Sequence, residues 1–273
     1  MLLSRQGASV LALGRGPGAQ VSLDLSRERW PDERFDAIVH CAARLPLRFE
    51  GPEADAAVAE IRAMDDRALD AASACGAHIV YFSTASLYGE TTGTIDEGTS
   101  PAPRLGYAHV KLATERALWD RGLHATVFRL VAPYGPRQTR VTVLRRFIDA
   151  AVTGAPLRYY GTGSRTQDFI HVADVAQAVA LALGATREQS DGVFVLASGV
   201  AIRMRELAEL VVRVTGSTSP VEAAGLPDPE ESRVIAYRID RLRGLGFLPS
   251  RSLAEGIAGW AAVRTAVLAR GHE

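Results

Sequence analysis

HIVYFSTAS, residues 78–86, is an apolar run that ends in hydroxyl side chains, and GYAHVK, residues 106–111, follows it after a loop rich in Gly, Thr and Pro. The first segment predicts a buried strand, and the second predicts the start of a helix. In that helix Tyr107 and Lys111 lie one turn apart on the same face. Because Thr84 stands at the end of the strand, the three side chains form a candidate proton-transfer site.

Lys111 is the only lysine among 31 basic side chains, and the other 30 are arginines. Lysine is a compact point charge whose pKa can be tuned, whereas the planar guanidinium of arginine stays protonated in proteins. The residue type therefore favours a functional Lys111 over a coincidental Y-x-x-x-K on a solvated helix. For the same reason we expect Lys111→Arg to be more damaging than its conserved charge suggests.

Further motifs occur in order along the chain. They are DAIVHCAA (36–43), STASLYG (83–89), Arg129 with PYGPRQ (133–138), GTG (161–163) with DFIHV (168–172), and LGF (245–247). Together with Y-x-x-x-K they resemble the extended short-chain dehydrogenase/reductases, the NAD-dependent epimerase/dehydratase group. The likeness covers nearly the whole chain, which makes it more specific than any single motif.

Strands alternate with helices as far as residue 130, which predicts an α/β fold with a doubly wound parallel (Rossmann-type) sheet. The more irregular second half resembles the smaller, interleaved C-terminal substrate lobe of that family. We therefore expect an NAD(P)-binding lobe over residues 1–133 and a substrate lobe over 134–273. The segment near 168–197 is expected to return to the first lobe.

The N-terminal end departs from the family pattern. A first strand and a G-x-x-G-x-x-G turn, which brings backbone N–H groups to the pyrophosphate, are expected before residue 8 but are not in the sequence. GRGPG (14–18) is no substitute, because it follows the second predicted strand and contains proline. Either the start is set late or the protein lacks the fingerprint. We expect residues 1–273 to bind dinucleotide weakly and to fold less stably than a chain extended upstream.

The resemblance implies NAD or NADP as cofactor. Gly14 followed by Arg15, at the end of the second predicted strand, suits a 2′-phosphate and slightly favours NADP, although an ordinary surface arginine is the competing interpretation. The family positions that would hold the dinucleotide are Arg15, Asp24, Ala42, Ala43, Tyr107, Lys111 and Pro133.

The resemblance also implies a mechanism. Tyr107 would act as general base on a secondary alcohol, while Lys111 and the positive nicotinamide bring the phenol pKa from about 10 toward 7. Thr84 would hydrogen-bond the same substrate oxygen. His109 and His171 have no carboxylate or other metal ligand at a spacing that would pair with them, so they are interpreted as structural.

Several positions narrow the reaction and the substrate. Relatives that dehydrate sugars carry Asp-Glu where this chain has Ala85-Ser86, so 4,6-dehydration is not expected, and epimerisation and carbonyl reduction stay open. A nucleotide-sugar is the expected substrate, with a non-nucleotide substrate as rival, because Ala132 and Gln167 replace the family's Asn and Arg. Ile61, Met64 and Asp65 are a further departure, where the family usually has Asn and Gly-Thr. The expected substrate-binding residues are Ser86, Tyr134, Arg137, Arg165 and Gln167. A non-redox, cofactor-free binding protein of the same fold is the alternative.

The composition limits which partners and which cellular compartment are expected. Thirty-one basic and 31 acidic side chains balance, which argues against a nucleic-acid partner. No stretch has the length and hydropathy of a signal peptide or a membrane span. Cys41 and Cys75 lack metal-ligand spacing and are expected to be buried thiols in a reducing cytoplasm. We therefore expect a cytoplasmic protein without a metal, acting as a homodimer.

Overall fold

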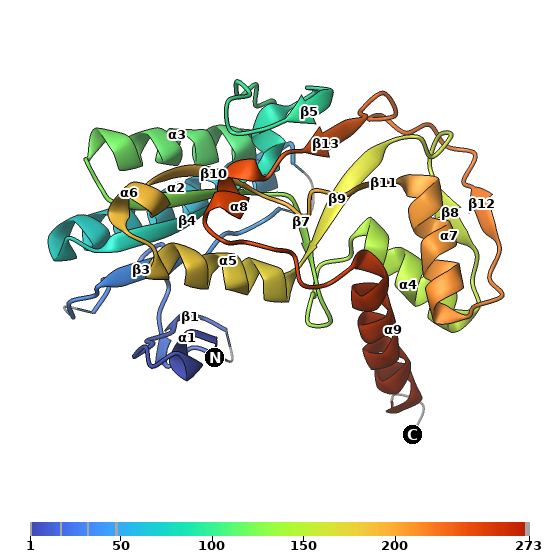
Figure 1. Cartoon of the computed structure of the whole chain (residues 1–273), viewed down its shortest axis with the longest axis horizontal. Helices are drawn as coiled ribbons and strands as arrows, with labels where there is room; N and C mark the ends of the chain where they lie inside the picture. Colours follow the sequence, from blue (N-terminus) through green and yellow to red (C-terminus); the bar gives the residue numbers. More distant parts are fainter. Residues whose placement is uncertain (1, 17, 32, 47–48, 271–273) are drawn as a thin grey trace.

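A parallel sheet of four strands forms the centre of the larger lobe. The computed structural model describes residues 2–16, 18–31, 33–46 and 49–270. The sheet has the order β10-β6-β4-β3, with β3 spanning Ala37–His40, β4 His78–Thr84, β6 Ala125–Leu130 and β10 Gly192–Leu196. Helices α2 (Pro52–Cys75) and α3 (Gly106–Asp120) cover one face, and α5 (Val172–Gly184) covers the other (Figure 1). The predicted doubly wound α/β fold is confirmed.

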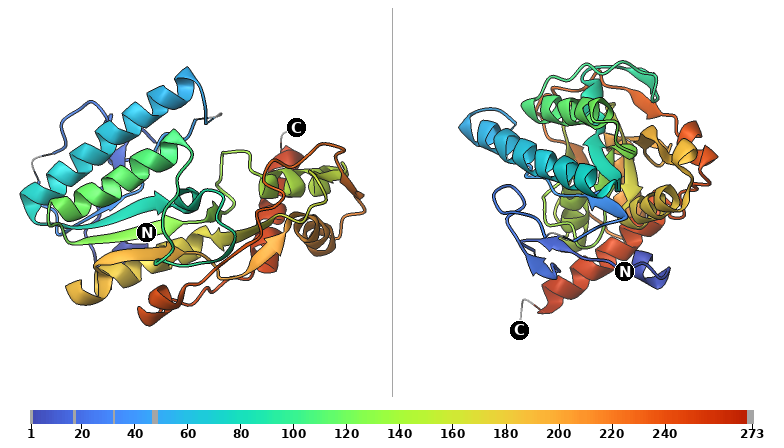
Figure 2. Two further views of the ribbon diagram at one scale, coloured as in Figure 1. Left: turned by 90° about the horizontal axis from the view of Figure 1, so that it is seen from above. Right: turned by 90° about the vertical axis from the view of Figure 1, so that its left-hand side faces the viewer.

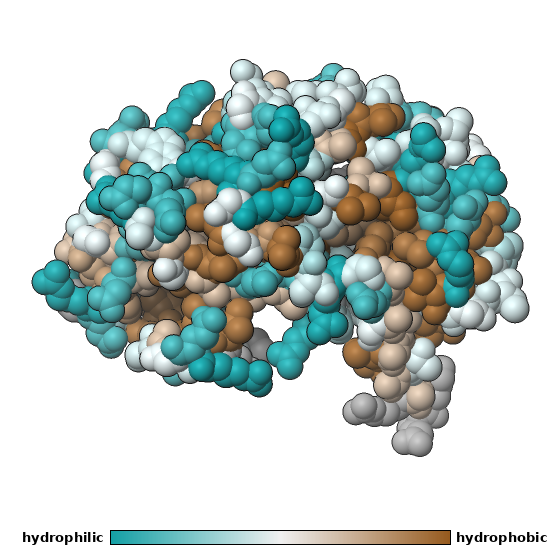
Figure 3. All heavy atoms as spheres, viewed as in Figure 1, coloured by the Kyte–Doolittle hydropathy of each residue, from teal (hydrophilic) through white to brown (hydrophobic). Residues whose placement is uncertain are grey.

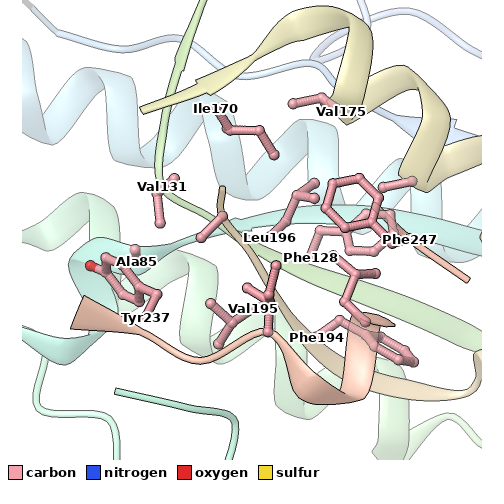
Figure 4. Close-up of a cluster of buried hydrophobic side chains, with 14 of the residues drawn as sticks. Ala85, Phe128, Val131, Ile170, Val175, Phe194, Val195, Leu196, Tyr237 and Phe247 are labelled. Carbon is pink, nitrogen blue, oxygen red and sulfur yellow. The ribbon is translucent and has the colours of Figure 1, made fainter. Parts of the chain in front are cut away.

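Strand β4 is buried on both faces, as its continuous apolar run predicts for a central parallel strand. Ile79 and Tyr81 face the core beneath α2 and α3, whereas Val80 faces the core beneath α5. Figure 4 shows this second core, where aromatic side chains such as Phe128 and Phe194 gather with aliphatic ones. The two faces hold β4 in one register, so the hydroxyl residues at its end have a defined position.

Helix α2 carries an apolar stripe along an otherwise polar, alanine-rich sequence. Its buried positions are Ala54, Ala57, Ile61, Met64, Asp65, Ala68, Leu69 and Ala72, which repeat at intervals of three and four residues. The helix ends at Gly76, whose left-handed conformation lets its N–H donate to the carbonyl oxygens of Ala72 and Ser73. One member of this stripe, Asp65, carries a charge into the core.

The second lobe packs α4 (Val143–Thr153), α7 (Met204–Thr215) and α9 (Leu253–Arg270) around a core that contains Trp260 (Figure 2). Strands β8 (Leu157–Tyr159) and β12 (Val221–Ala223) pair at its edge; β12 lies in the segment 217–229, which the sequence predicts to be a loop. The strands between the lobes are β7 (Ala132–Tyr134), β9 (Thr166–His171), β11 (Ala201–Arg203), β5 (Gly93–Ile95) and β13 (Ile235–Tyr237). The chain crosses back between β9 and β11, because α5, the short helix α6 (Arg187–Ser190) and β10 belong to the central sheet side. The short helix α8 (Asp240–Gly244) packs near β10.

The N-terminal segment forms a small unit beside the central sheet. Helix α1 (Leu2–Arg5) precedes β1 (Leu13–Gly14) and β2 (Val21–Ser22), which pair with each other in parallel. Both strands are shorter than the strands predicted over 8–13 and 21–25. Within the described residues no strand pairs with the outer edge of β3. The unit contacts the rest of the chain through α1, which lies near α5, and through Arg15, which pairs with Glu60, while an opening lies beside it (Figure 3). Pro17, which interrupts GRGPG, lies outside the described residues.

Three features of the chain as a whole concern its cysteines, its helices and its His, Cys, Asp and Glu side chains. The two thiols are not buried as predicted, because Cys41 is exposed and Cys75 is half-buried. Among the described residues, no helix combines the length and the hydropathy that crossing a bilayer requires. Within the same residues, no group of three or more His, Cys, Asp or Glu side chains is arranged to hold a metal ion.

Two histidines stack at the start of the central strands. The rings of His78 and His124 lie 3.7 Å apart with an interplanar angle of 9°. Nε2 of His78 lies 2.9 Å from Oγ1 of Thr126, and Nε2 of His124 lies 3.0 Å from Oγ of Ser190. Burial, followed by the neighbouring His124, lowers the pKa of His78 to about 4. Burial likewise lowers the pKa of His124.

We expect the thermal midpoint to fall as the pH is lowered from 6.5 to 4. In this window unfolded His78, with an ordinary pKa near 6.5, binds its proton while folded His78 does not, so acid favours the unfolded state. Thermal melts of wild type and His78→Gln at several pH values measure the effect. The slope should be shallower in His78→Gln, whereas the exposed His109→Gln should keep the wild-type slope. Equal slopes in all three proteins would rule out His78 as the source.

Candidate active site at the end of the central strands

Thr84 and Tyr107 meet at the carboxyl end of β4. Thr84 is the last residue of β4 and the N-cap of the short 3-10 helix η1 (Ala85–Tyr88), where its Oγ1 accepts a hydrogen bond from the Ser86 N–H at 3.1 Å. Tyr107 lies in the first turn of α3, close enough to the Thr84 side chain for Thr84 to lower the pKa of its phenol. The structure therefore brings together two of the three residues predicted to move a proton.

The phenol of Tyr107 is protonated in the surroundings that the structure provides. Burial raises its pKa to about 12; the Thr84 side chain and the Arg140 charge act in the opposite direction, and the negative charge of Asp65 adds to the rise. At pH 7 a phenol with this pKa is ionised in roughly one molecule in 10⁵. Lys111 is not among the main causes of this shift, and the predicted lowering of the Tyr107 pKa by Lys111 together with the positive nicotinamide concerns the protein with dinucleotide bound.

Lys111 is buried rather than open to a ligand. The residue is 1% exposed, its Nζ lies 3.6 Å from Oδ1 of Asp65, and the ammonium lies over the Tyr81 ring at 4.5 Å from the centroid. Burial lowers the pKa of Lys111, while the charge of Asp65 opposes this change. Lys111 therefore faces a carboxylate of its own chain.

Asp65 is the residue of this site that the sequence interpretation missed. The sequence marks it as a departure from the family pattern without a role. The sequence does contain a signal for a buried role of Asp65, namely its place on α2. There a carboxylate interrupts an apolar stripe one turn after Ile61 and one turn before Leu69. A charge at such a position is costly unless a partner compensates it. A buried partner could therefore have been inferred, although not which one.

A polar cavity of about 180 Å³ opens beside Thr84. Its lining residues are Thr84, Ala85, Ser86, Leu130, Val131, Ala132, Arg165, Thr166, Gln167, Asp168, Arg233, Ile235 and Tyr237. They include three of the predicted substrate-binding residues, namely Ser86, Arg165 and Gln167. Because ligand sites for whole drug-sized molecules are usually larger, this cavity suits the reacting part of a substrate.

The charges around the cavity are largely satisfied by the protein itself. Nε of Arg165 lies 2.8 Å from Oδ2 of Asp228, and Nη1 of Arg233 lies 3.5 Å from Glu230. Asp168 accepts hydrogen bonds from the N–H groups of Ser198 and Gly199; burial raises its pKa, and these hydrogen bonds oppose the rise. Nε of Arg233 has no hydrogen-bond partner among the described residues. Arg233 and Tyr237, which sequence reasoning did not find, reach the cavity through β13 and the loop before it.

Two predicted substrate-binding residues lie elsewhere. Tyr134 is 3% exposed and packs against Trp260 and Phe169 in the core of the second lobe, so its side chain is not open to a ligand. Arg137 is exposed and does not line the cavity. The turn after β7 directs the tyrosine inward, a choice that the motif PYGPRQ does not reveal. Pro133, a predicted cofactor contact, is exposed beside this turn.

The predicted adenosine contacts form a charged cluster in which Arg15 is not free. Its guanidinium lies 3.0 Å from Glu60 and 3.5 Å from Asp24, and Glu60 also pairs with Arg44 at 3.0 Å. The Ser26 hydroxyl and N–H donate to Asp24 and lower its pKa. A 2′-phosphate at this position would meet two carboxylates, which weighs against the predicted preference for NADP.

The remaining cofactor positions fit a dinucleotide in part. Ala42 follows β3 and packs with Tyr107 against the cluster of Ile61, Met64 and Val110, while its neighbour Ala43 is exposed. Small residues here leave room for a ligand at the carboxyl ends of the strands. Oγ of Ser83 is buried without a hydrogen-bond partner at the end of β4. Among the described residues no glycine-rich turn leads from a strand into a helix to cradle a pyrophosphate.

Comparison with known proteins gives the same family as the motifs. The model of the family described as NAD dependent epimerase/dehydratase matches residues 3–197. An uncharacterised UDP-glucose epimerase, YtcB from Bacillus subtilis, is 31% identical over 119 residues, which are 41% of this chain and 38% of YtcB. A dTDP-glucose 4,6-dehydratase from Actinoplanes sp. is 28% identical over 187 residues, which are 66% of this chain and 57% of that protein. The chain thus spans less than two thirds of the length of both.

The fold of a solved structure is similar over almost the full chain. MoeE5 in complex with UDP-glucuronic acid and NAD superposes with a TM-score of 0.84, at 24% identity, over 97% of this chain and 94% of that chain. At this level of identity the likeness establishes the fold alone.

Proposed function

This chain belongs to the NAD-dependent epimerase/dehydratase family, and from that membership we propose that it epimerises a nucleotide-sugar by oxidising and re-reducing one secondary alcohol. The observation that carries the proposal is that Tyr107 lies close enough to Thr84 for Thr84 to act on the pKa of its phenol, and that Thr84 lines a polar cavity. A hydroxyl of a sugar in this cavity would lie beside Thr84 and within reach of a phenol that exchanges protons. General acid–base catalysis requires this proximity before it requires a matched pKa.

Tyr107 is proposed to hold and move the proton. As the phenolate it would take the proton from the substrate hydroxyl in the oxidising step, and as the phenol thus formed it would return the proton to the carbonyl oxygen in the reducing step. Thr84 acts to lower the pKa of the phenol and so favours the phenolate. NAD, when bound, supplies the acceptor and donor of the hydride. The residues that would hold it are Asp24, Ala42 and Ala43, with Tyr107 at the reacting end.

The cavity supports epimerisation over 4,6-dehydration. Elimination of water needs an acid and a base near the sugar, and Asp168 is the one carboxylate among the described lining residues. Both of its oxygens are engaged by backbone N–H groups. Ala85 and Ser86, which follow Thr84, offer no carboxylate. One relative of this chain is named as a dTDP-glucose 4,6-dehydratase. The preference for epimerisation over dehydration is therefore part of the proposal.

We also propose NAD rather than NADP as the cofactor. The pairing of Arg15 with Glu60 and Asp24 supports it, because a carboxylate can accept hydrogen bonds from ribose hydroxyls but repels a phosphate. MoeE5, which shares the fold, is described in complex with NAD.

The test is to incubate the purified chain with NAD and, in turn, UDP- and dTDP-hexoses, and to follow the sugar anomeric protons by NMR. We expect a second hexose that differs at one carbinol centre, with no net consumption of NAD, and little or no turnover with NADP. A 4-keto-6-deoxy product would replace the proposal by dehydration, and net oxidation of added NADH with a keto-sugar would replace it by carbonyl reduction. Dinucleotide and sugar binding without any exchange would favour the non-redox alternative.

A further inference from the structure

The carboxylate of Asp65 is the centre of a buried polar cluster that lies under the candidate active site. It is 1% exposed and has partners on three other elements. His40 at the end of β3 lies 2.8 Å from Oδ1, and Tyr81 on β4 donates to Oδ2 at 2.5 Å. On α3, Thr114 donates to Oδ2 at 2.9 Å, and Nζ of Lys111 lies 3.6 Å from Oδ1.

Within this cluster the carboxylate of Asp65 and the ammonium of Lys111 compensate each other's charge. Asp65 and Lys111 are both shielded from water, and an ion without a partner in such a place is strongly disfavoured. His40, Tyr81 and Thr114 occupy the hydrogen-bonding positions of the carboxylate, so Lys111 serves it as a counter-charge. Burial acts to raise the pKa of Asp65, but the His40 hydrogen bond and the Lys111 charge outweigh it and lower the pKa.

We propose that Asp65 is a positioning residue for the reaction, which holds the Lys111 ammonium charged and in place beneath Tyr107. The catalytic part of this inference rests on the proposed function, whereas the Asp65–Lys111 pair itself does not. A lysine held in this way presents a fixed dipole, with the carboxylate on α2 and the ammonium on α3, rather than a free positive charge.

Other charged groups near Lys111 do not replace Asp65. Cys41, after β3, and Glu115, on α3, both act on the pKa of Lys111, but less than Asp65 does. Glu115 is already engaged by Arg129 at 2.8 Å. Tyr81 offers its ring, Tyr107 is a neutral phenol under these conditions, and His40 directs its Nε2 to Asp65. The negative partner of the lysine is therefore Asp65.

The same carboxylate also acts on the candidate base. Its charge raises the pKa of Tyr107, so the pair influences the phenol as a unit. Removing the carboxylate would weaken the hold on the Lys111 proton and would at the same time remove a charge that opposes the phenolate. This predicts a change in the pH dependence of the reaction, which loss of packing would not produce.

The single lysine allows a direct test. Protein labelled with ¹³C-lysine gives one side-chain ε-CH₂ signal, whose pH titration follows Lys111 alone. In Asp65→Asn we expect the titration midpoint to move down by about 1–3 pH units relative to wild type, since a close opposite charge shifts a pKa by this amount. Asp66→Asn, the exposed neighbour on α2, is the matched control and should leave the midpoint unchanged. Asp65→Glu keeps the negative charge, so its Lys111 titration midpoint should lie close to that of wild type.

Two further measurements keep the proposal open to refutation. If Asp65→Asn does not fold, Asp65→Asn/Lys111→Met should melt at a higher temperature than Asp65→Asn, because both charges are then removed; no recovery would overturn the pairing. In the active protein, the basic limb of the pH profile of turnover should move to lower pH in Asp65→Asn but not in Asp66→Asn. An unmoved NMR midpoint overturns the pairing, and an unmoved profile overturns the positioning role. If wild type shows no turnover, the proposed function fails while the NMR titration can still be read.

Discussion

Replacing Tyr107 with phenylalanine is expected to lower turnover by roughly 10²–10⁴-fold, the range that a positioned general acid–base contributes. The change removes the one oxygen that is asked to move a proton and keeps the ring that packs against the cluster of Ile61, Met64 and Val110. We therefore expect the affinity for dinucleotide to stay within a few-fold of wild type. Single-turnover rates, measured with saturating NAD and substrate, separate this loss of chemistry from a loss of binding.

The control for this experiment is Tyr160→Phe, because Tyr160 is an exposed tyrosine of the second lobe that does not line the cavity. Its rate should equal that of wild type. Single-turnover transfer at a near wild-type rate in Tyr107→Phe would contradict the assignment of the proton to the phenol.

Replacing Arg129 with methionine should destabilise the protein by roughly 3–5 kcal/mol, as expected when one partner of a buried ion pair is lost. Nη2 of Arg129 lies 2.8 Å from Oε2 of Glu115, and both side chains are almost fully buried between β6 and α3. Nη1 of Arg129 also donates to the Tyr88 hydroxyl at 3.2 Å. Without the guanidinium, the Glu115 carboxylate loses the positive group that is hydrogen-bonded to it. Chemical denaturation of wild type and variant gives the difference in the free energy of unfolding.

Two further variants test whether burial of the ion pair causes this loss of stability. Arg129→Met/Glu115→Leu should recover most of the loss, since removing both charges of a buried pair is far less costly than removing one. Arg121→Met breaks a pair with Asp70 of similar length, 2.6 Å, but its side chains are 34% and 70% exposed. That variant should lose at most about 1 kcal/mol. Equal losses in Arg129→Met and Arg121→Met would show that burial does not govern the energetics of the Arg129 pair.

Much of the fold could be predicted because its signals are local. The apolar run 78–84, the stripe of α2 and the run 125–130 each carry the period of their element, and the structure has strands and a helix at these places. The sequence SLAE (252–255) is a capping-box pattern that predicts the start of the last helix, and in the structure the Ser252 hydroxyl accepts from the Glu255 N–H at 3.2 Å. The short strand β12 was missed because its three residues form a strand through pairing with β8 rather than through their own pattern.

Within the candidate site, the sequence by itself determined that Thr84 and Tyr107 share the carboxyl edge of the sheet. A strand end and the first turn of a following helix are placed there by spacing along the chain. The tertiary structure decided which charges meet. Lys111 faces Asp65, Arg15 faces Glu60 and Tyr134 faces Trp260, and in each case the partner lies on a distant element. Side-chain pairing depends on how helices and strands pack and on the free-energy cost of burying a charge without a partner. The local pattern of residues along the chain does not determine either of these.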